Sequence, residues 1–149
     1  MLDLSLAIAH HLAVFAVVAI FAAEWLLLRP GLDDQGLRRL VMIDRAYGAV
    51  AGLIIVVGVL RVIYGGSGWD YYAANWAFWS KMAAFGIVGL ATVPPTIAII
   101  RWARARKADP HYRVAAGALM AQRRYLWVQL AAFACIPIFA AAMARGYGV

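Results

Sequence analysis

The chain alternates long apolar runs with short polar segments. Four windows are apolar and long enough to cross a membrane: about residues 6–28, 46–64, 78–100 and 125–143. A hydrocarbon core about 30 Å thick needs about 20 helical residues, and only helices or closed barrels satisfy main-chain polar groups in lipid. The pattern predicts an all-α fold, an integral membrane bundle of four transmembrane helices forming one domain over residues 1–149.

The composition supports lipid as the main solvent. Hydrophobic residues make up 66 % of the chain and charged residues 14 %. Soluble domains typically contain about 45–50 % hydrophobic and about 25 % charged residues. So small a domain has too little interior to hide the excess. A single cysteine, Cys135, also excludes an intrachain disulfide and zinc sites built from cysteine pairs.

The net charge is +7, and the positions of the basic residues predict how the chain is oriented in the membrane. Four arginines lie between residues 29 and 45 and seven Lys or Arg residues between 101 and 124, against Arg145 alone on the opposite side. Because short loops rich in Lys and Arg stay in the cytoplasm, both termini and the 65–77 loop are expected on the outer, periplasmic side of the inner membrane. The same residues are expected to contact anionic headgroups, so nucleic acid is not an expected partner.

The connecting segments carry further signals. The amphipathic stretch 36–45 is expected to extend the second helix into the cytoplasm, and residues 111–124 to extend the fourth. Pro94 and Pro95 predict a kink or a local unwinding of the third helix, because proline lacks an N–H donor. A glycine-rich turn at 65–68 precedes several Trp and Tyr residues, which are expected to anchor the outer interface rather than bind a cofactor.

Few ionisable residues lie inside the predicted spans, and each is a candidate functional residue because burying a charge in lipid is costly. His10 and His11 lie about one turn inside the outer start of the first helix. Arg61 lies about one turn before the outer end of the second helix, and Lys81 about one turn after the outer start of the third. This common depth favours a shared site, and the alternative is that Arg61 and Lys81 reach the headgroups independently.

The two histidines cannot ligate one metal from opposite sides, because adjacent helical residues point about 100° apart. One is a candidate metal or haem ligand and the other is expected to point elsewhere. No other predicted span contains a histidine. A haem here would therefore have one histidine and a weaker ligand, of which Lys81 is the leading candidate, or would lie between two copies of the chain.

Two further features concern the deeper half of the helices. Glu24 lies on nearly the same face as His10 but about 21 Å deeper. It is expected to pair with an arginine such as Arg45, Arg101 or Arg124, and the alternative is a proton-relay role. On the second helix, Gly48 and Gly52 would let a neighbouring helix approach closely.

These residues occur in a familiar order: a histidine early in the first helix, Arg45-Ala46-Tyr47-Gly48 opening the second, and Trp79-Ser80-Lys81 opening the third. Over about residues 6–100 the chain resembles the HemJ-type protoporphyrinogen IX oxidases and the wider CopD-like group of small membrane proteins, as an uncharacterised branch. The resemblance implies a haem b protein that oxidises protoporphyrinogen IX. His10 or His11 would take its histidine role, Lys81 its lysine role and Arg45 its arginine position. Glu24 and Arg61 are not part of that pattern.

Three functions remain open at this point. The first is a redox protein with a porphyrin between the first three helices, in which His10 or His11 binds iron and Lys81 or Arg61 binds iron or the propionates. As an enzyme it would be a membrane oxidoreductase acting on a porphyrinogen, with a quinone or another respiratory acceptor. The second is an accessory or assembly subunit in a homo-oligomer or larger membrane complex. The third is copper or ion transport, for which the metal ligands are few.

Overall fold

The computed structural model describes residues 2–65 and 68–148. These residues form five helices: α1 (Leu2–Leu27), α2 (Asp34–Tyr64), α3 (Gly68–Ala74), α4 (Trp76–Ala108) and α5 (Ala116–Ala144). Within the described ranges no strand occurs. All of the helices except the short α3 are long and apolar enough to cross a membrane. The predicted all-α membrane bundle is confirmed.

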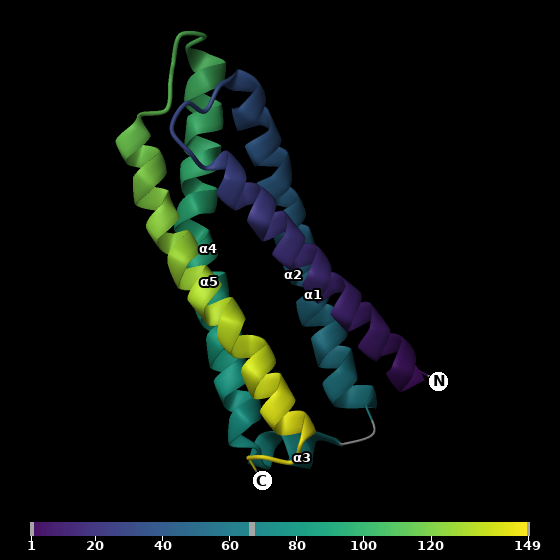
Figure 1. Ribbon diagram of the computed structural model, residues 1–149. Helices are drawn as coiled ribbons and strands as arrows, with labels where there is room; N and C mark the ends of the chain where they lie inside the picture. Colours follow the sequence, from purple (N-terminus) through teal and green to yellow (C-terminus); the bar gives the residue numbers. More distant parts are fainter. Residues whose placement is uncertain (1, 66–67, 149) are drawn as a thin grey trace.

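The long helices form two antiparallel hairpins, α1 with α2 and α4 with α5, and α2 lies against α4 (Figure 1). The loops at 28–33 and 109–115 lie at one end of the bundle, which we call the loop end. Both termini and α3 lie at the other end, which we call the terminal end (Figure 1). The structure thus confirms that the termini share one end, while the side of the membrane that each end faces stays a prediction.

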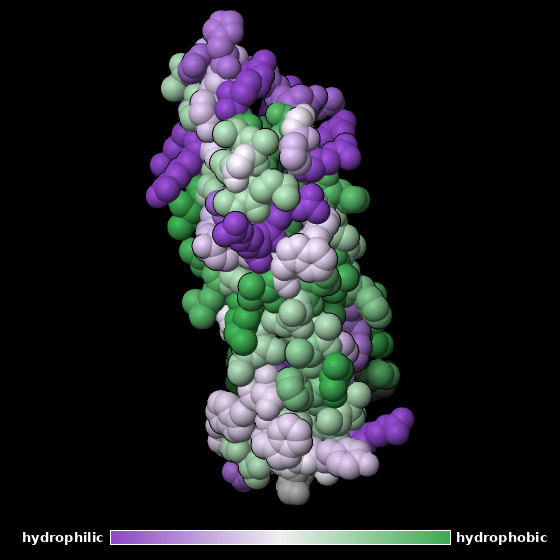
Figure 2. Space-filling view, turned by 60° about the vertical axis from the view of Figure 1, so that its left-hand side comes forward, coloured by the Kyte–Doolittle hydropathy of each residue, from purple (hydrophilic) through white to green (hydrophobic). Residues whose placement is uncertain are grey.

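The surface is divided in the same way (Figure 2). Polar side chains gather at the loop end, an apolar belt covers the middle, and side chains of intermediate hydropathy cover the terminal end. Phe15 and Leu90 are 72 % and 76 % exposed, as expected where lipid replaces water. Exposed aromatic residues occur at the terminal end, among them Trp69, Trp76 and Tyr147, where an interfacial belt was expected.

Helix α2 begins where the sequence predicted its extension. The side chain of Asp33 accepts a hydrogen bond from the main-chain N–H of Gly36 at 2.7 Å and caps the helix. The predicted extension of the last helix is wrong in part. Residues 111–115 are not helical, and α5 begins at Ala116 without a side-chain cap.

The prolines in α4 do not unwind it, because the backbone stays helical from Trp76 to Ala108. Pro95 has no N–H to donate to the carbonyl of Ala91, four residues earlier. Instead, the side-chain amide of Gln129 on α5 donates to that carbonyl, with a distance of 3.2 Å from Nε2 to the oxygen. A neighbouring helix therefore supplies the hydrogen bond that Pro95 removes. Of the two predicted alternatives, the unwinding is wrong and the kink stays a prediction.

Helix α3 was not predicted, and part of the predicted 65–68 turn lies outside the described residues. The helix is held against its neighbours by polar contacts. The Tyr71 hydroxyl donates to the carbonyl of Met143 at 3.0 Å, and Trp79 donates through its ring N–H to the carbonyl of Ala73 at 3.0 Å. These bonds fix the start of α4 and the end of α5 against α3.

Candidate functional site

Three predicted site residues from three helices lie together near the terminal end: His10 on α1, Arg61 on α2 and Lys81 on α4. His10 lies within electrostatic range of both cations, and Lys81 within range of Arg61. A Cβ atom at Gly58 would lie 3.7 Å from Cε1 of His10, so the ring rests against α2 one turn before Arg61. We call His10, Arg61 and Lys81 the histidine cluster.

The two neighbouring histidines differ in their surroundings. The Nδ1 atom of His10 is buried and has no hydrogen-bond partner among the described residues. The His11 side chain is exposed, and its Nδ1 atom lies 2.7 Å from the carbonyl oxygen of Ala7, within hydrogen-bond distance. The rings lie 6.3 Å apart at 87°. His10 thus lies in the cluster while His11 points elsewhere, as the helical geometry predicted for one of the pair.

Arg61 and Lys81 form no ion pair with an acid in the part of the chain that the structure describes. The ion pairs found there join Asp34 to Arg106 and Arg113, at the loop end. The Nε atom of Arg61 is buried without a hydrogen-bond partner. The Nζ atom of Lys81 lies 5.4 Å from the centre of the Phe78 ring, a cation–π distance. An acid, Asp3 on α1, lies by the end of α2. Its Oδ1 atom would lie 3.4 Å from a Cβ atom at Gly65, one turn after Arg61. The cluster therefore carries positive charge without an ion pair.

Arg45, grouped with these residues from the sequence, does not lie with them. It precedes Arg61 by 16 residues on α2, or about 24 Å along the helix axis, and its side chain is exposed. The close approach predicted at Gly48 and Gly52 is also wrong within this chain, because no atom would lie within 4 Å of a Cβ at either position.

A second polar group lies nearer the loop end, and sequence reasoning largely missed it. Asp44 is 8 % exposed, and its Oδ1 atom accepts a hydrogen bond from the Thr96 hydroxyl at 2.6 Å. Gln129 is 1 % exposed, and its Oε1 atom accepts from the hydroxyls of Tyr47 at 3.1 Å and Thr92 at 3.2 Å. Together with Glu24, these side chains are called the buried network below.

The signal for this network lies in residue spacing. Asp44 and Tyr47 are three residues apart on α2, and Thr92 and Thr96 are four apart on α4. Such pairs share one helix face. Asp44 was interpreted only as part of an amphipathic extension, so its position on the inner face was overlooked.

Glu24 belongs to this network rather than to an ion pair. It is 2 % exposed and lies within electrostatic range of Asp44 and Tyr47. No ion pair joins it to Arg45, Arg101 or Arg124 in the described residues, so the predicted pairing is wrong. The physical reason is position, because Glu24 faces the bundle interior while these arginines are exposed.

A family model described as "Predicted membrane protein (DUF2214)" matches residues 2–148. The chain belongs to this DUF2214 family. No curated protein and no solved structure matches the chain. The family description confirms the membrane class, and its wording supports an uncharacterised membrane family. It contains no reference to haem or to the HemJ-type and CopD-like proteins.

The chemistry available to this DUF2214 chain follows from its two polar groups. The histidine cluster offers one imidazole and two cations, a set suited to an anionic ligand that also needs a nitrogen donor. The buried network offers carboxyl, amide and hydroxyl groups in two hydrogen-bonded sets, Asp44 with Thr96 between α2 and α4, and Gln129 with Tyr47 and Thr92 between α5, α2 and α4. Within the described residues no group of three or more His, Cys, Asp or Glu side chains could hold a metal ion.

Proposed function

We propose that this DUF2214 chain binds haem b or a related porphyrin at the histidine cluster and has a redox role in the membrane. One observation carries the proposal: the Nδ1 atom of His10 is buried and unpartnered, beside two cations that have no acidic partner in the described chain. An imidazole nitrogen without a hydrogen bond can serve as an axial haem ligand. Lysine and arginine are suited to binding carboxylates.

The charge of the cluster supports an anionic ligand. A cation held in an apolar environment is costly unless a negative group compensates it. Arg61 and Lys81 supply a pair of positive charges, and the propionates of a porphyrin would supply a pair of negative ones. His10 and Arg61 belong to one helical hairpin and Lys81 to the other. A ligand held by all three would therefore join the two hairpins.

The protein's own contribution would be to hold and shield the group. His10 would fix its centre, while Arg61 and Lys81 would fix its acidic edge. Haem supplies one-electron chemistry when bound, and its potential depends on the axial ligand and on burial. Phe78, which is 6 % exposed and lies at a cation–π distance from Lys81, would help to keep water away from such a centre.

A more specific form of the proposal is oxidation of a porphyrinogen, with a quinone or another respiratory component as electron acceptor. It rests on the resemblance of the His10, Arg45 and Lys81 segments to HemJ-type proteins. Arg45 lies about 24 Å along α2 from Arg61, so a role for Arg45 would be exercised away from the histidine cluster.

The visible spectrum of the purified protein tests the proposal. The full chain is produced in cells supplied with ample haem, extracted in mild detergent and measured before and after reduction with dithionite. A Soret band that shifts on reduction is expected. A wild-type preparation without a Soret band would contradict the proposal and favour an accessory subunit or an ion transporter.

A further inference from the structure

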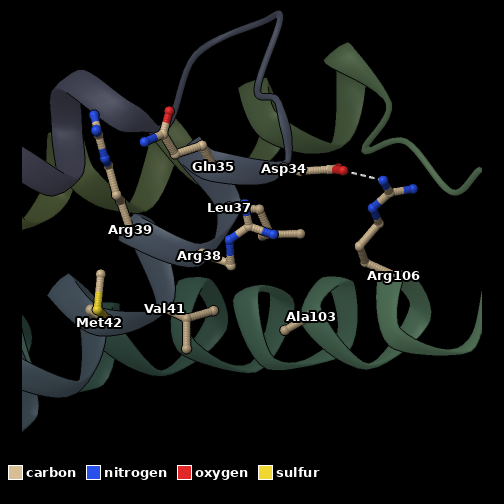
Figure 3. A pocket seen from close by; sticks show the side chains of 9 residues that line it. All are labelled: Asp34, Gln35, Leu37, Arg38, Arg39, Val41, Met42, Ala103 and Arg106. Atoms are coloured by element: carbon tan, nitrogen blue, oxygen red, sulfur yellow. Dashed lines mark hydrogen bonds and ion pairs between the residues drawn. The ribbon is translucent and has the colours of Figure 1, made fainter. Parts of the chain in front are cut away.

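An open groove of about 580 Å³ lies between the first turns of α2 and the last turns of α4, at the loop end (Figure 3). Its polar rim includes Arg38, Arg39 and Arg106. Its apolar lining includes Val41, Met42 and Ala103. This groove is far from the histidine cluster, which lies at the opposite end of the same helices.

The rim carries an excess of positive charge. Asp34 is the only acid among the residues that line the groove, and it is paired with Arg106 (Figure 3). The Nη1 atom of Arg113 lies 3.6 Å from its other carboxylate oxygen. Arg38 and Arg39 form no ion pair in the part of the chain that the structure describes. Both guanidinium groups therefore stay available to an anion.

The lining changes from polar to apolar along the helix axis. The charged residues lie near the end of the bundle, and Val41 and Met42 lie about one turn further toward its middle. Met42 is 61 % exposed, so the apolar part of the groove is open at the side of the bundle. A phospholipid has the same order of groups, a charged headgroup followed by acyl chains.

We propose that this groove binds one anionic phospholipid. Arg38 and Arg39, whose side chains point in different directions (Figure 3), supply the positive charge that attracts its phosphate, and an acyl chain lies along Met42 and Ala103. Basic pockets between membrane helices are suited to anionic headgroups. A free phosphate would use the arginines but not the apolar lining, so the groove as a whole favours the lipid. Because α2 and α4 belong to different hairpins, the bound lipid would contact both.

Native mass spectrometry of the full chain in detergent tests this site. Dioleoylphosphatidylglycerol is the anionic probe, and dioleoylphosphatidylcholine is the zwitterionic reference. The wild type is expected to retain the anionic lipid in preference. The double variant Arg38→Gln/Arg39→Gln is expected to bind it about 30-fold more weakly, since each arginine near anionic headgroups contributes roughly a factor of five.

The matched control is Arg104→Gln/Arg124→Gln, which removes the same charge from exposed arginines outside the groove. Exposed charges outside the groove are screened by salt, so in detergent this control should bind the anionic lipid within about twofold of the wild type. Equal weakening in both double variants would show general surface attraction and overturn the proposal. Equal retention of the two lipids by the wild type would overturn it as well.

Two further measurements distinguish a bound lipid from a bound phosphate ion and guard against a folding defect in the arginine variant. Inorganic phosphate that displaces the lipid at equal concentration would show a phosphate site and overturn the lipid assignment. If the arginine variant does not fold, Met42→Glu is used instead, because that position is exposed and a carboxylate there would repel the headgroup and crowd the acyl chain. Unchanged lipid binding by Met42→Glu would contradict the proposed acyl position.

Discussion

At the scale of single residues, the difference between His10 and His11 matters most. They are neighbours in sequence, yet one has a buried, unpartnered ring nitrogen and the other is exposed. The helical turn of about 100° per residue produces this difference. The sequence could predict that only one histidine enters a site, but the choice between them depends on the position of α2, which lies against the His10 ring at Gly58.

Lys81 gives a testable consequence of the same cluster. Replacing it with Gln removes the charge but keeps a side chain of similar length. If Lys81 binds a propionate, Lys81→Gln should weaken haem binding at least about tenfold, because a charge-assisted hydrogen bond contributes roughly 1.5–3 kcal/mol. Haem titration into apoprotein measures this. Arg145→Gln, an exposed basic residue at the same end, is the control and should keep wild-type affinity, and an equal loss in both would count against the role of Lys81.

At the scale of elements, the buried network joins helices that the sequence treats separately. Glu24 and Asp44 were visible as acids near the ends of apolar windows, but which side chains they meet depends on how α1, α2 and α4 pack. The short α3 was missed because seven residues are too few for a helical apolar pattern to emerge. Helix existence could therefore be predicted from apolar runs, whereas these polar contacts between helices could not.

The contact between Gln129 and α4 predicts a measurable coupling. Gln129→Leu leaves the Ala91 carbonyl and the hydroxyls of Tyr47 and Thr92 without this partner, and should lower the free energy of unfolding by about 1–3 kcal/mol. Pro95→Ala restores a main-chain donor to Ala91. In the Pro95→Ala background, Gln129→Leu should therefore lower the free energy of unfolding by about 1 kcal/mol less than it does in the wild type.

Denaturant unfolding of the four proteins in detergent, followed by circular dichroism, measures the cycle. The wild type, both single variants and the double variant are compared under one condition. Additive effects of the two substitutions would show that Gln129 does not compensate for the proline.

At the scale of the whole molecule, hydrophilic side chains at the loop end and side chains of intermediate hydropathy at the terminal end define two unlike ends (Figure 2). The four apolar windows along the sequence were enough to group both termini at one end, because each window reverses the direction of the chain. The groove at the loop end was not predictable in this way, since it depends on how α2 and α4 lie side by side.

The orientation of these ends is directly testable. In a Cys135→Ser background, a cysteine replaces Asp70 on α3 or Gln35 at the start of α2, and intact cells receive a membrane-impermeant maleimide. The positive-inside rule predicts labelling at position 70 and protection at position 35 until the cells are broken. Labelling of position 35 in intact cells would reverse the orientation.

The most direct test of the central claim is the ratio of haem to protein in His10→Ala and His11→Ala, purified in parallel with the wild type. If His10 ligates haem at the histidine cluster, His10→Ala should lose most of its haem while His11→Ala keeps nearly the wild-type ratio. Retention of haem by His10→Ala, or equal loss in both variants, would contradict it.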